Sequence, residues 1–206
     1  MEAEFLAPDA TIIADELQLH RMTMNLCKNA ADAMPNGGFL SVRLEQLRVY
    51  AARTCSRGRL TPGSYLSLTV GDSGAGIDPD FLHRIFDPFF TTKPVGEGTG
   101  LGLALVDRTV ADIGGAIDVW RKAEPEAGTD FQIWLPISKP RESSKLETVN
   151  QDTTLSASLR ASSWARMSGL FSLVVGNGGT INSNRPATTP APKLLALQRA
   201  GASPHG

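Results

Sequence analysis

Asn25, Asn29 and Asp32 recur at intervals of four and three residues within a largely apolar stretch. A helix places these positions on one face. Asparagine is a mediocre helix former, so two stacked carboxamides require an explanation. Amide oxygens are suitable ligands for Mg²⁺, a hard ion that takes oxygen donors beside substrate phosphates. The alternative is an exposed polar stripe, and the glycine clusters farther along the chain favour the ligand role.

One carboxylate, Asp72, opens the first of two glycine clusters, and the second lies at residues 96–102. Glycine is tolerated where a backbone takes positive φ or approaches a ligand closely, so these clusters indicate bare amides that face an anionic or planar group. A loop with many turns is the alternative. The glycines concerned are Gly74, Gly76, Gly96, Gly98, Gly100 and Gly102.

The second cluster runs directly into a segment with apolar residues at helical spacing, from Leu101 to Ile113. Unpaired N–H groups and the positive end of the helix dipole then coincide, which makes an anion site worth about 0.3–1 kcal/mol for each exposed charge.

Two common nucleotide loops are excluded. The pattern GxGxxG fails because its third glycine would fall on Leu101 or Leu103, and GxxxxGK[ST] requires a Gly-Lys pair that the chain lacks.

Four segments follow one another in the chain: NLCKNAADA at 25–33, DSGAG at 72–76, FDPFF at 86–90 and GTGLG at 98–102. In this order they resemble the N, G1, F and G2 boxes of the ATP-binding domain of sensor histidine kinases, within the gyrase/Hsp90/histidine-kinase/MutL superfamily. The resemblance implies an α/β fold, the two-layer sandwich of the Bergerat type. In it, helices cover one face of a mixed, largely antiparallel sheet, and the nucleotide lies between the helices and a lid. We expect this domain at residues 1–139.

The resemblance also implies roles for individual residues. A carboxylate at the position of Asp72 accepts a hydrogen bond from the exocyclic amine of adenine, and such a bond to a charged group is worth about 1.5–3 kcal/mol. Guanine presents an oxygen acceptor at the same place, so ATP is expected rather than GTP. Asn29 is assigned to Mg²⁺, Asn25 to the phosphate side, and the Thr129 hydroxyl to the support of Asp72. The expected nucleotide contacts are Asn25, Asn29, Asp72, Gly74, Gly76, Ile77, Phe86, Thr92, Lys93, Gly98, Thr99, Gly100, Leu101, Gly102 and Thr129.

Residues 91–97 are expected to form the lid, and lids of this kind order when ligand binds. Lys93 is the only cation in this segment and is the best candidate to follow the terminal phosphates. Lys28 either meets a phosphate as a point charge or is a solvated helix lysine. The predicted catalytic residues are therefore Asn25, Lys28 and Lys93.

Other patterns predict the elements that position these residues. Asp15 occupies the N-cap position of a helix that Pro-Asn-Gly-Gly at 35–38 ends. Alternating apolar residues predict strands at 39–47 and 65–70, and the second strand delivers Asp72 at its end. Further strands are expected at 11–14, 116–120 and 128–136, helical turns at 79–84 and a turn-rich segment at 50–63. We expect Phe86, Phe89 and Phe90 to pack at the base of the lid, and contact of these rings with the ligand is the alternative.

Residues 140–206 are rich in Ser, Thr, Ala, Pro and Gly without a sustained period, which predicts a disordered tail. Residues 170–175 are one possible strand within it. No receiver domain is assigned, because Gly-Asn-Gly-Gly follows at the place where paired acidic residues would be needed.

The histidines His20, His83 and His205 do not occupy the His-Glu/Asp-x-x-x-Pro setting of the family's phosphoacceptor. We therefore expect a kinase that transfers the γ-phosphoryl of Mg-ATP to a histidine on a dimerisation hairpin outside this chain, with the receiver domain of a response regulator as a further partner. Hydrolases of the superfamily carry a glutamate one helical turn before the metal asparagine as general base, and here that position is Asn25. An ATP hydrolase and a nucleotide-binding module without turnover stay open as alternatives.

The charge balance argues against a nucleic-acid partner. Residues 1–140 hold 13 Lys and Arg against 18 Asp and Glu, whereas a nucleic-acid-binding face needs clustered positive charge. Cys27 and Cys55 form no pair at metal or disulfide spacing. No apolar run approaches the roughly 20 residues that cross a bilayer. We therefore expect a cytoplasmic segment without membrane contact, whose parent protein could be membrane-anchored.

Overall fold

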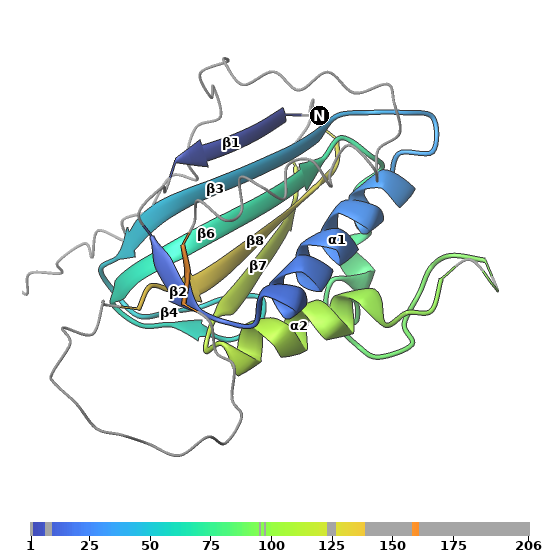
Figure 1. Ribbon diagram of the computed structural model, residues 1–206. Helices are drawn as coiled ribbons and strands as arrows, with labels where there is room; N and C mark the ends of the chain where they lie inside the picture. Colours follow the sequence, from blue (N-terminus) through green and yellow to red (C-terminus); the bar gives the residue numbers. More distant parts are fainter. Residues whose placement is uncertain are drawn as a thin grey trace, which may run out of the picture.

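The computed structural model describes residues 2–6, 10–94, 96, 98–122, 127–138 and 158–160, and for residues 3–6 and 158–160 only the backbone is described. Within this part of the chain, two α-helices lie on one face of a five-stranded sheet (Figure 1). Helix α1 spans Glu16–Asp32, helix α2 spans Gly102–Asp112, and a 3₁₀ turn spans Pro79–Phe81. This arrangement confirms the predicted two-layer α/β sandwich.

The sheet has the strand order β1-β3-β6-β8-β7. Strands β3 and β1 pair in parallel, and the remaining neighbours pair antiparallel. The central strand β6 pairs with β3 over its whole length and with β8 from Tyr65 to Gly71. The bounds are Glu2–Leu6 for β1, Leu40–Val49 for β3, Gly63–Asp72 for β6, Ala116–Arg121 for β7 and Thr129–Pro136 for β8.

Helix α1 begins as the sequence predicts. The Asp15 carboxylate accepts a hydrogen bond from the Gln18 amide at 3.0 Å, which satisfies one of the free N–H groups of the first turn. At the other end, Gly37 adopts φ +84° in the turn that follows Asp32. The helix thus ends just before the predicted Pro-Asn-Gly-Gly stop.

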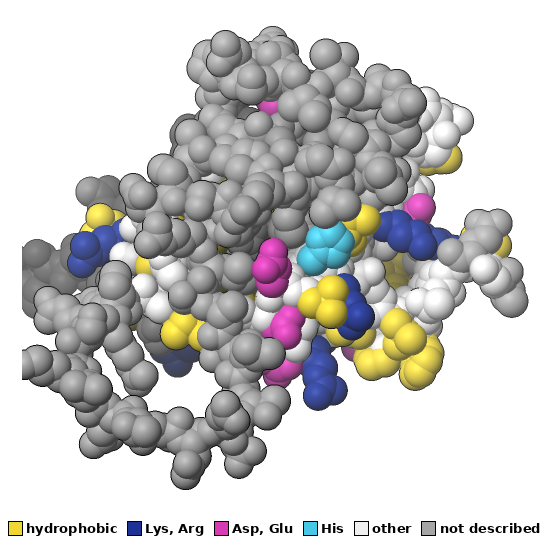
Figure 2. Space-filling view, in the orientation of Figure 1, with side chains coloured by type: hydrophobic (Ala, Val, Ile, Leu, Met, Phe, Trp, Pro, Cys, Tyr) yellow, Lys and Arg dark blue, Asp and Glu magenta, His cyan; other side chains and the backbone are white. Residues whose placement is uncertain are grey.

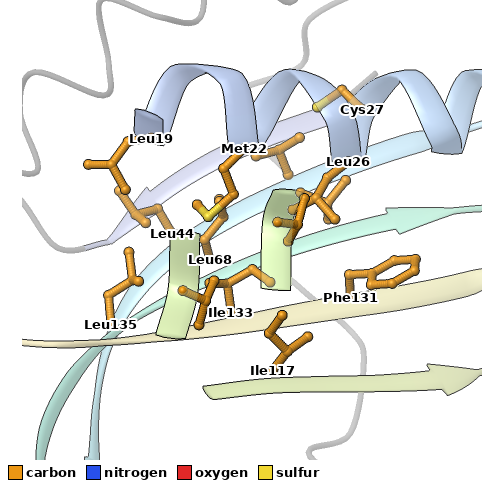
Figure 3. Close-up of a cluster of buried hydrophobic side chains, with 14 of the residues drawn as sticks. Leu19, Met22, Leu26, Cys27, Leu44, Leu68, Ile117, Phe131, Ile133 and Leu135 are labelled. Atoms are coloured by element: carbon orange, nitrogen blue, oxygen red, sulfur yellow. The ribbon is translucent and has the colours of Figure 1, made fainter. Parts of the chain in front are cut away.

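The core lies between α1, α2 and the sheet. From α1, the side chains of Leu19, Met22 and Leu26 point toward the strands, where they meet Leu44 and Leu68 among others (Figure 3). Each of these five side chains is at most 1% exposed. Full burial of one such side chain is worth about 1.5–3 kcal/mol. This contact fixes the distance between the helix layer and the sheet.

The opposite face of the sheet carries a second, smaller cluster. It consists of Leu60, Tyr65, Ala116 and Trp134. A short hairpin made of β4, Arg53–Thr54, and β5, Arg59–Leu60, covers it. The sequence predicts only a turn-rich connection here, so the hairpin adds regular structure that the pattern did not indicate.

Strand β2, Thr11–Ile13, lies outside the large sheet and pairs antiparallel with β9, Ser158–Arg160. Strand β9 lies within residues 140–206, the segment for which the sequence predicts a disordered tail. The rest of 140–206, with the possible strand at 170–175, lies outside the described residues. None of the helices described is both long and apolar enough to cross a membrane.

Candidate nucleotide site

Asp72 is the last residue of the central strand β6 and is 4% exposed. Its Oδ1 atom accepts hydrogen bonds from the Gly74 amide at 2.8 Å and from the Thr129 amide at 3.3 Å. No described residue donates a hydrogen bond to Oδ2. The two amides therefore hold the carboxylate in one orientation, and Oδ2 is the oxygen left to accept a hydrogen bond from a ligand.

Burial raises the pKa of Asp72, because a charged carboxylate loses hydration at this position. The amides of Gly74 and Thr129 and the positive charge of Lys122 lower the pKa, but burial outweighs them. Lys122 donates a hydrogen bond to the Asp72 carbonyl oxygen at 2.8 Å and lies 3.5 Å from a carboxylate oxygen of Asp130. The site thus contains a buried acid that is fixed by backbone groups.

No pattern in the sequence indicated Lys122 as a site residue. It follows strand β7 directly and comes close to Asp72 only through the pairing of Arg121 with Thr129 across β7 and β8. Thr129 itself is 2% exposed. The contact that the structure shows from Thr129 to Asp72 comes from the backbone amide, whereas the family resemblance implies support by the hydroxyl.

Two glycines of the expected nucleotide loops are required by backbone contacts within the protein. A Cβ atom on Gly74 would lie 2.4 Å from the Ala33 carbonyl oxygen. Gly100 adopts φ +65°, and its Cβ atom would lie 2.3 Å from the Phe89 carbonyl carbon. Gly74 thus lets the loop after β6 pass the end of α1, and Gly100 lets the segment before α2 pass the Phe turn.

The asparagines of α1 meet the beginning of α2. Asn25 and Asn29 are half-buried, and a Cβ atom on Gly102 would lie 3.6 Å from Asn25 Oδ1 and 3.9 Å from Asn29 Nδ2. Among the described residues, neither carboxamide has a hydrogen-bond partner. The structure thus brings two unpaired amide side chains to the helix start at which the sequence predicts an anion site.

Lys93, in the predicted lid, reaches back to the same helix. Its ammonium group pairs with the Asp32 carboxylate, and both side chains are about one-third exposed. Lys28 is exposed on α1. The lid cation is therefore held one helical turn from Asn29.

The other predicted lid residues lie close to Lys93 and to the start of α2. Thr91 Oγ1 accepts a hydrogen bond from the Lys93 amide at 3.1 Å, and Thr92 is exposed. Thr99 Oγ1 accepts a weak hydrogen bond from the Leu101 amide at 3.4 Å. Gly98 is half-buried, whereas residues 95 and 97 lie outside the described part of the lid.

The Phe turn is only partly a packing unit. Phe86 is 3% exposed and belongs to the main core, and Phe90 packs against Phe81 with ring centroids 5.7 Å apart. Phe89, in contrast, is 75% exposed with φ +68°, so the expected packing is wrong for this residue. Its role lies in the backbone, because the Phe89 amide donates a hydrogen bond to the Gly100 carbonyl at 2.9 Å.

The remaining predicted residues occupy compatible positions. Ile77 and Gly76 follow Asp72 in the same loop, and Ile77 packs against the core. No group of three or more His, Cys, Asp or Glu side chains that could hold a metal ion occurs among the described residues. A cation at this site would therefore depend on amide oxygens and on the phosphates of a ligand, which is how Mg²⁺ often binds beside nucleotides.

The outer surface of the helix layer carries mixed charge. Figure 2 shows Lys and Arg side chains between Asp, Glu and apolar side chains over α1 and α2. One such pair on α2, Arg108 and Asp112, lies 3.8 Å apart. On the described part of this face, the basic side chains do not form the stripe that nucleic acids require.

Comparisons with known proteins agree with this geometry. Residues 14–139 match the family model described as histidine kinase-, DNA gyrase B- and HSP90-like ATPase. The sensor kinase CckA of Brucella abortus is 42% identical over 123 residues, which cover 60% of this chain and 13% of CckA. The sensor histidine kinase ZraS of Escherichia coli is 36% identical over 143 residues, which cover 68% of this chain and 27% of ZraS.

A solved structure of the mycobacterial sensor histidine kinase MprB is similar with a TM-score of 0.50 and 33% sequence identity. The similarity covers 66% of this chain and 81% of the MprB chain. The chain matches less than a third of the length of CckA and of ZraS. Both relatives therefore contain large regions with no counterpart in the matched segment.

Proposed function

The chain belongs to the histidine kinase-, DNA gyrase B- and HSP90-like ATPase family, and we propose that it is the catalytic, ATP-binding part of a sensor histidine kinase. The observation that carries this proposal is the free Oδ2 of buried Asp72 at one end of the site, with the unpaired carboxamides of Asn25 and Asn29 at the other. These groups match the two ends of a nucleotide. A buried acceptor suits the base, and neutral oxygens beside a helix start suit the phosphates and their cation.

In the proposed mechanism, Asp72 Oδ2 accepts a hydrogen bond from the exocyclic amine of adenine and so fixes the base. The amides at the start of α2 bind phosphate oxygens, and Asn25 orients the same phosphates. Asn29 would hold Mg²⁺, which would supply positive charge beside the phosphates. Lys93 exchanges the Asp32 carboxylate for the terminal phosphate and there stabilises the charge of the transferring group.

Transfer to a histidine agrees better with these residues than hydrolysis. A hydrolase needs a general base to activate water, and the residue one turn before Asn29 is Asn25, whose carboxamide does not take up a proton at neutral pH. Phosphoryl transfer to a nucleophile brought by another segment needs chiefly positioning and charge stabilisation. We propose a histidine-bearing dimerisation hairpin as that segment and a receiver domain as the later acceptor.

The binding part of the proposal is tested by calorimetry on the folded chain. Wild-type protein is expected to release or absorb heat with Mg-ATP, and the Asp72→Ala variant is expected to lose at least about tenfold in affinity, since a hydrogen bond to a charged group is worth about 1.5–3 kcal/mol. Equal affinity in the two proteins would contradict the assignment of Asp72 to adenine.

The catalytic part is tested with labelled ATP, with the chain alone and with a separate hairpin from a related kinase. We expect label on the hairpin histidine and none on this chain. Label on His20, His83 or His205 would overturn our interpretation of the histidines. Binding without transfer to any hairpin would favour a nucleotide-binding module without turnover.

A further inference from the structure

The hairpin of β4 and β5 has no part in the mechanism above, yet it contacts the helix layer at a specific place. Its turn is tight, because the Cys55 amide donates a hydrogen bond to the Gly58 carbonyl at 3.2 Å. Gly58 adopts φ +77°, and its Cβ atom would lie 3.1 Å from the Gly115 carbonyl oxygen. The tip of the hairpin therefore lies directly against the beginning of β7.

The tip binds the outer edge of β7, which is the edge strand of the sheet. The backbone of Arg57 exchanges two hydrogen bonds with Ile117, each 2.9 Å long. The Val119 amide donates a further bond to Ser56 Oγ at 3.1 Å. The hairpin thus satisfies polar groups that an edge strand otherwise leaves open.

Side chains at the base of the hairpin hold it in this position. Arg53 donates two hydrogen bonds to the Asp118 carboxylate, at 2.6 and 3.2 Å, and its guanidinium lies over the Trp134 ring. The Trp134 indole N–H donates to the same carboxylate at 2.9 Å. Leu60, the last residue of β5, is fully buried. Because several contacts fix the hairpin, the position of its tip residue is well defined.

Arg57 extends from this tip around the sheet edge to the helix side. Its guanidinium carbon lies 5.2 Å from the centre of the Phe86 ring, and its Nε atom lies 3.4 Å from Asp107 Oδ2 on α2. The Nε atom is buried and makes no hydrogen bond to a described residue, so attraction between the charges holds the pair. One side chain therefore contacts two elements that lie far apart in the sequence.

The two contacts lie on either side of the predicted lid in the sequence. Phe86 precedes the lid segment 91–97, and Asp107 lies on α2, whose first residue, Gly102, follows that segment. The backbone bond between Phe89 and Gly100 joins the two sides a second time. The Phe turn thus contacts the segment that leads into α2 and carries the Gly100 amide.

We propose that Arg57 is a positioning residue for the phosphate end of the site. It attaches both sides of the lid to the rigid sheet edge through the hairpin, and so keeps the start of α2 oriented toward the phosphates. This inference rests on the proposed function. It predicts that loss of Arg57 weakens the binding of phosphates but leaves the recognition of the base by Asp72 unchanged.

The test compares Arg57→Ala with Arg59→Ala in the full chain. Arg59 lies on the same hairpin and is exposed, and its side chain makes no hydrogen bond, ion pair or ring contact with a described residue, so its substitution removes the same charge without the same contacts. Affinity is measured for Mg-ATP by calorimetry and for adenosine by NMR titration. Adenosine reports on the base site alone.

We expect Arg57→Ala to lower the affinity for Mg-ATP about 3- to 10-fold, from the loss of one cation–π contact and one partly exposed ion pair. Its affinity for adenosine is expected to equal that of the wild type, and Arg59→Ala is expected to change neither value. Arg57→Lys, which keeps the charge, is expected to recover part of the loss. If Arg57→Ala does not fold, Asp107→Asn breaks the pair from the side of α2 and is expected to act in the same direction.

Three results would overturn the inference. In the first, Arg57→Ala and Arg59→Ala bind Mg-ATP equally well. In the second, Arg57→Ala loses Mg-ATP and adenosine in the same proportion, as a merely destabilised fold would. In the third, the wild type binds neither ligand, which rejects the proposed function together with this inference. The first two results leave the proposed function intact.

Discussion

At the scale of single residues, the main feature of the site is that the two carboxylate oxygens of Asp72 differ in their hydrogen-bond partners. Oδ1 is occupied by the amides of Gly74 and Thr129, and Oδ2 is free among the described residues. In an Asp72→Asn variant, the same two amides would select the carbonyl oxygen. The NH₂ group would then face the ligand, opposite the adenine amine, and two donors would meet.

We therefore predict that Asp72→Asn loses about 10- to 100-fold in affinity for Mg-ATP, as measured by calorimetry at pH 7. Binding of Mg-ATP needs the ionised form of Asp72, and burial raises the pKa of this residue. As the solution is acidified, the affinity of the wild type is therefore expected to fall at a higher pH than it would with an aspartate of ordinary pKa. A pH profile of the affinity checks this. A profile that is flat down to the usual range of aspartate would contradict it.

Stability should change in the opposite direction. A raised pKa in the folded state means that the ionised carboxylate opposes folding in full above the folded pKa; this cost shrinks as the pH falls through the folded pKa and is absent below the pKa of the unfolded state. Asp72→Asn is therefore expected to unfold at a higher temperature than the wild type at pH 7, with the difference shrinking in acid. The ionised carboxylate of Asp72 thus supports ligand binding but lowers the free energy of unfolding.

The ion pair of Lys93 with Asp32 leads to a second prediction. If Lys93 must leave Asp32 to reach a phosphate, then Asp32→Asn removes a competitor. Exposed pairs are worth about 0.2–1 kcal/mol, so we expect the affinity for Mg-ATP to rise up to about fivefold. Lys93→Ala is expected to lower the affinity instead. A loss of affinity in Asp32→Asn would indicate that Asp32 itself supports the cation or the phosphates.

At the scale of elements, two positive-φ glycines flank α2. Gly100 precedes the helix and would bring a Cβ atom within 2.3 Å of Phe89, whereas Gly114 follows it and has open space within 4 Å. We predict that Gly100→Ala weakens Mg-ATP binding at least about tenfold, because the φ strain of about 1–2 kcal/mol adds to the displacement of the Phe turn. Gly114→Ala carries the strain alone and is expected to lower the melting temperature without changing affinity.

Elements with local signals were predictable from the sequence. The Asp15 cap, the apolar face of α1 and the strands β3 and β6 depend on residues close together in the chain, and the structure confirms each of them, although only β3 shows the alternating burial that the pattern predicts. The position of Asp72 at a strand end followed from the same alternation. These features needed no knowledge of the rest of the molecule.

Features that depend on distant contacts were missed. Lys122 reaches Asp72 only through the register of β7 with β8, and Arg57 reaches Phe86 only because the hairpin binds the sheet edge. No local pattern distinguishes these residues from other surface cations. The exposure of Phe89 was missed for a related reason, because an apolar residue was assumed to pack where its backbone hydrogen bond was the constraint.

At the scale of the whole molecule, the site is divided between two layers. The acid for the base lies on the central strand of the sheet, whereas the carboxamides lie on α1 and the phosphate loop precedes α2 (Figure 1). The buried core lies between these layers and sets their separation. A nucleotide that contacts both layers should therefore stabilise the fold as well as bind to it.

This leads to a last prediction, which compares the core variant Leu68→Ala with the site variant Asp72→Asn. Leu68 is 1% exposed, and its truncation is expected to lower the free energy of unfolding by about 2–5 kcal/mol. Mg-ATP at about 100 times its Kd is expected to raise the free energy of unfolding by about 2.7 kcal/mol in the wild type and in Leu68→Ala alike. Asp72→Asn is expected to start from a higher melting temperature and to gain little from the same ligand concentration. Thermal melts with and without Mg-ATP separate the two effects, and equal gains in all three proteins would mean that the ligand stabilises the fold without using Asp72.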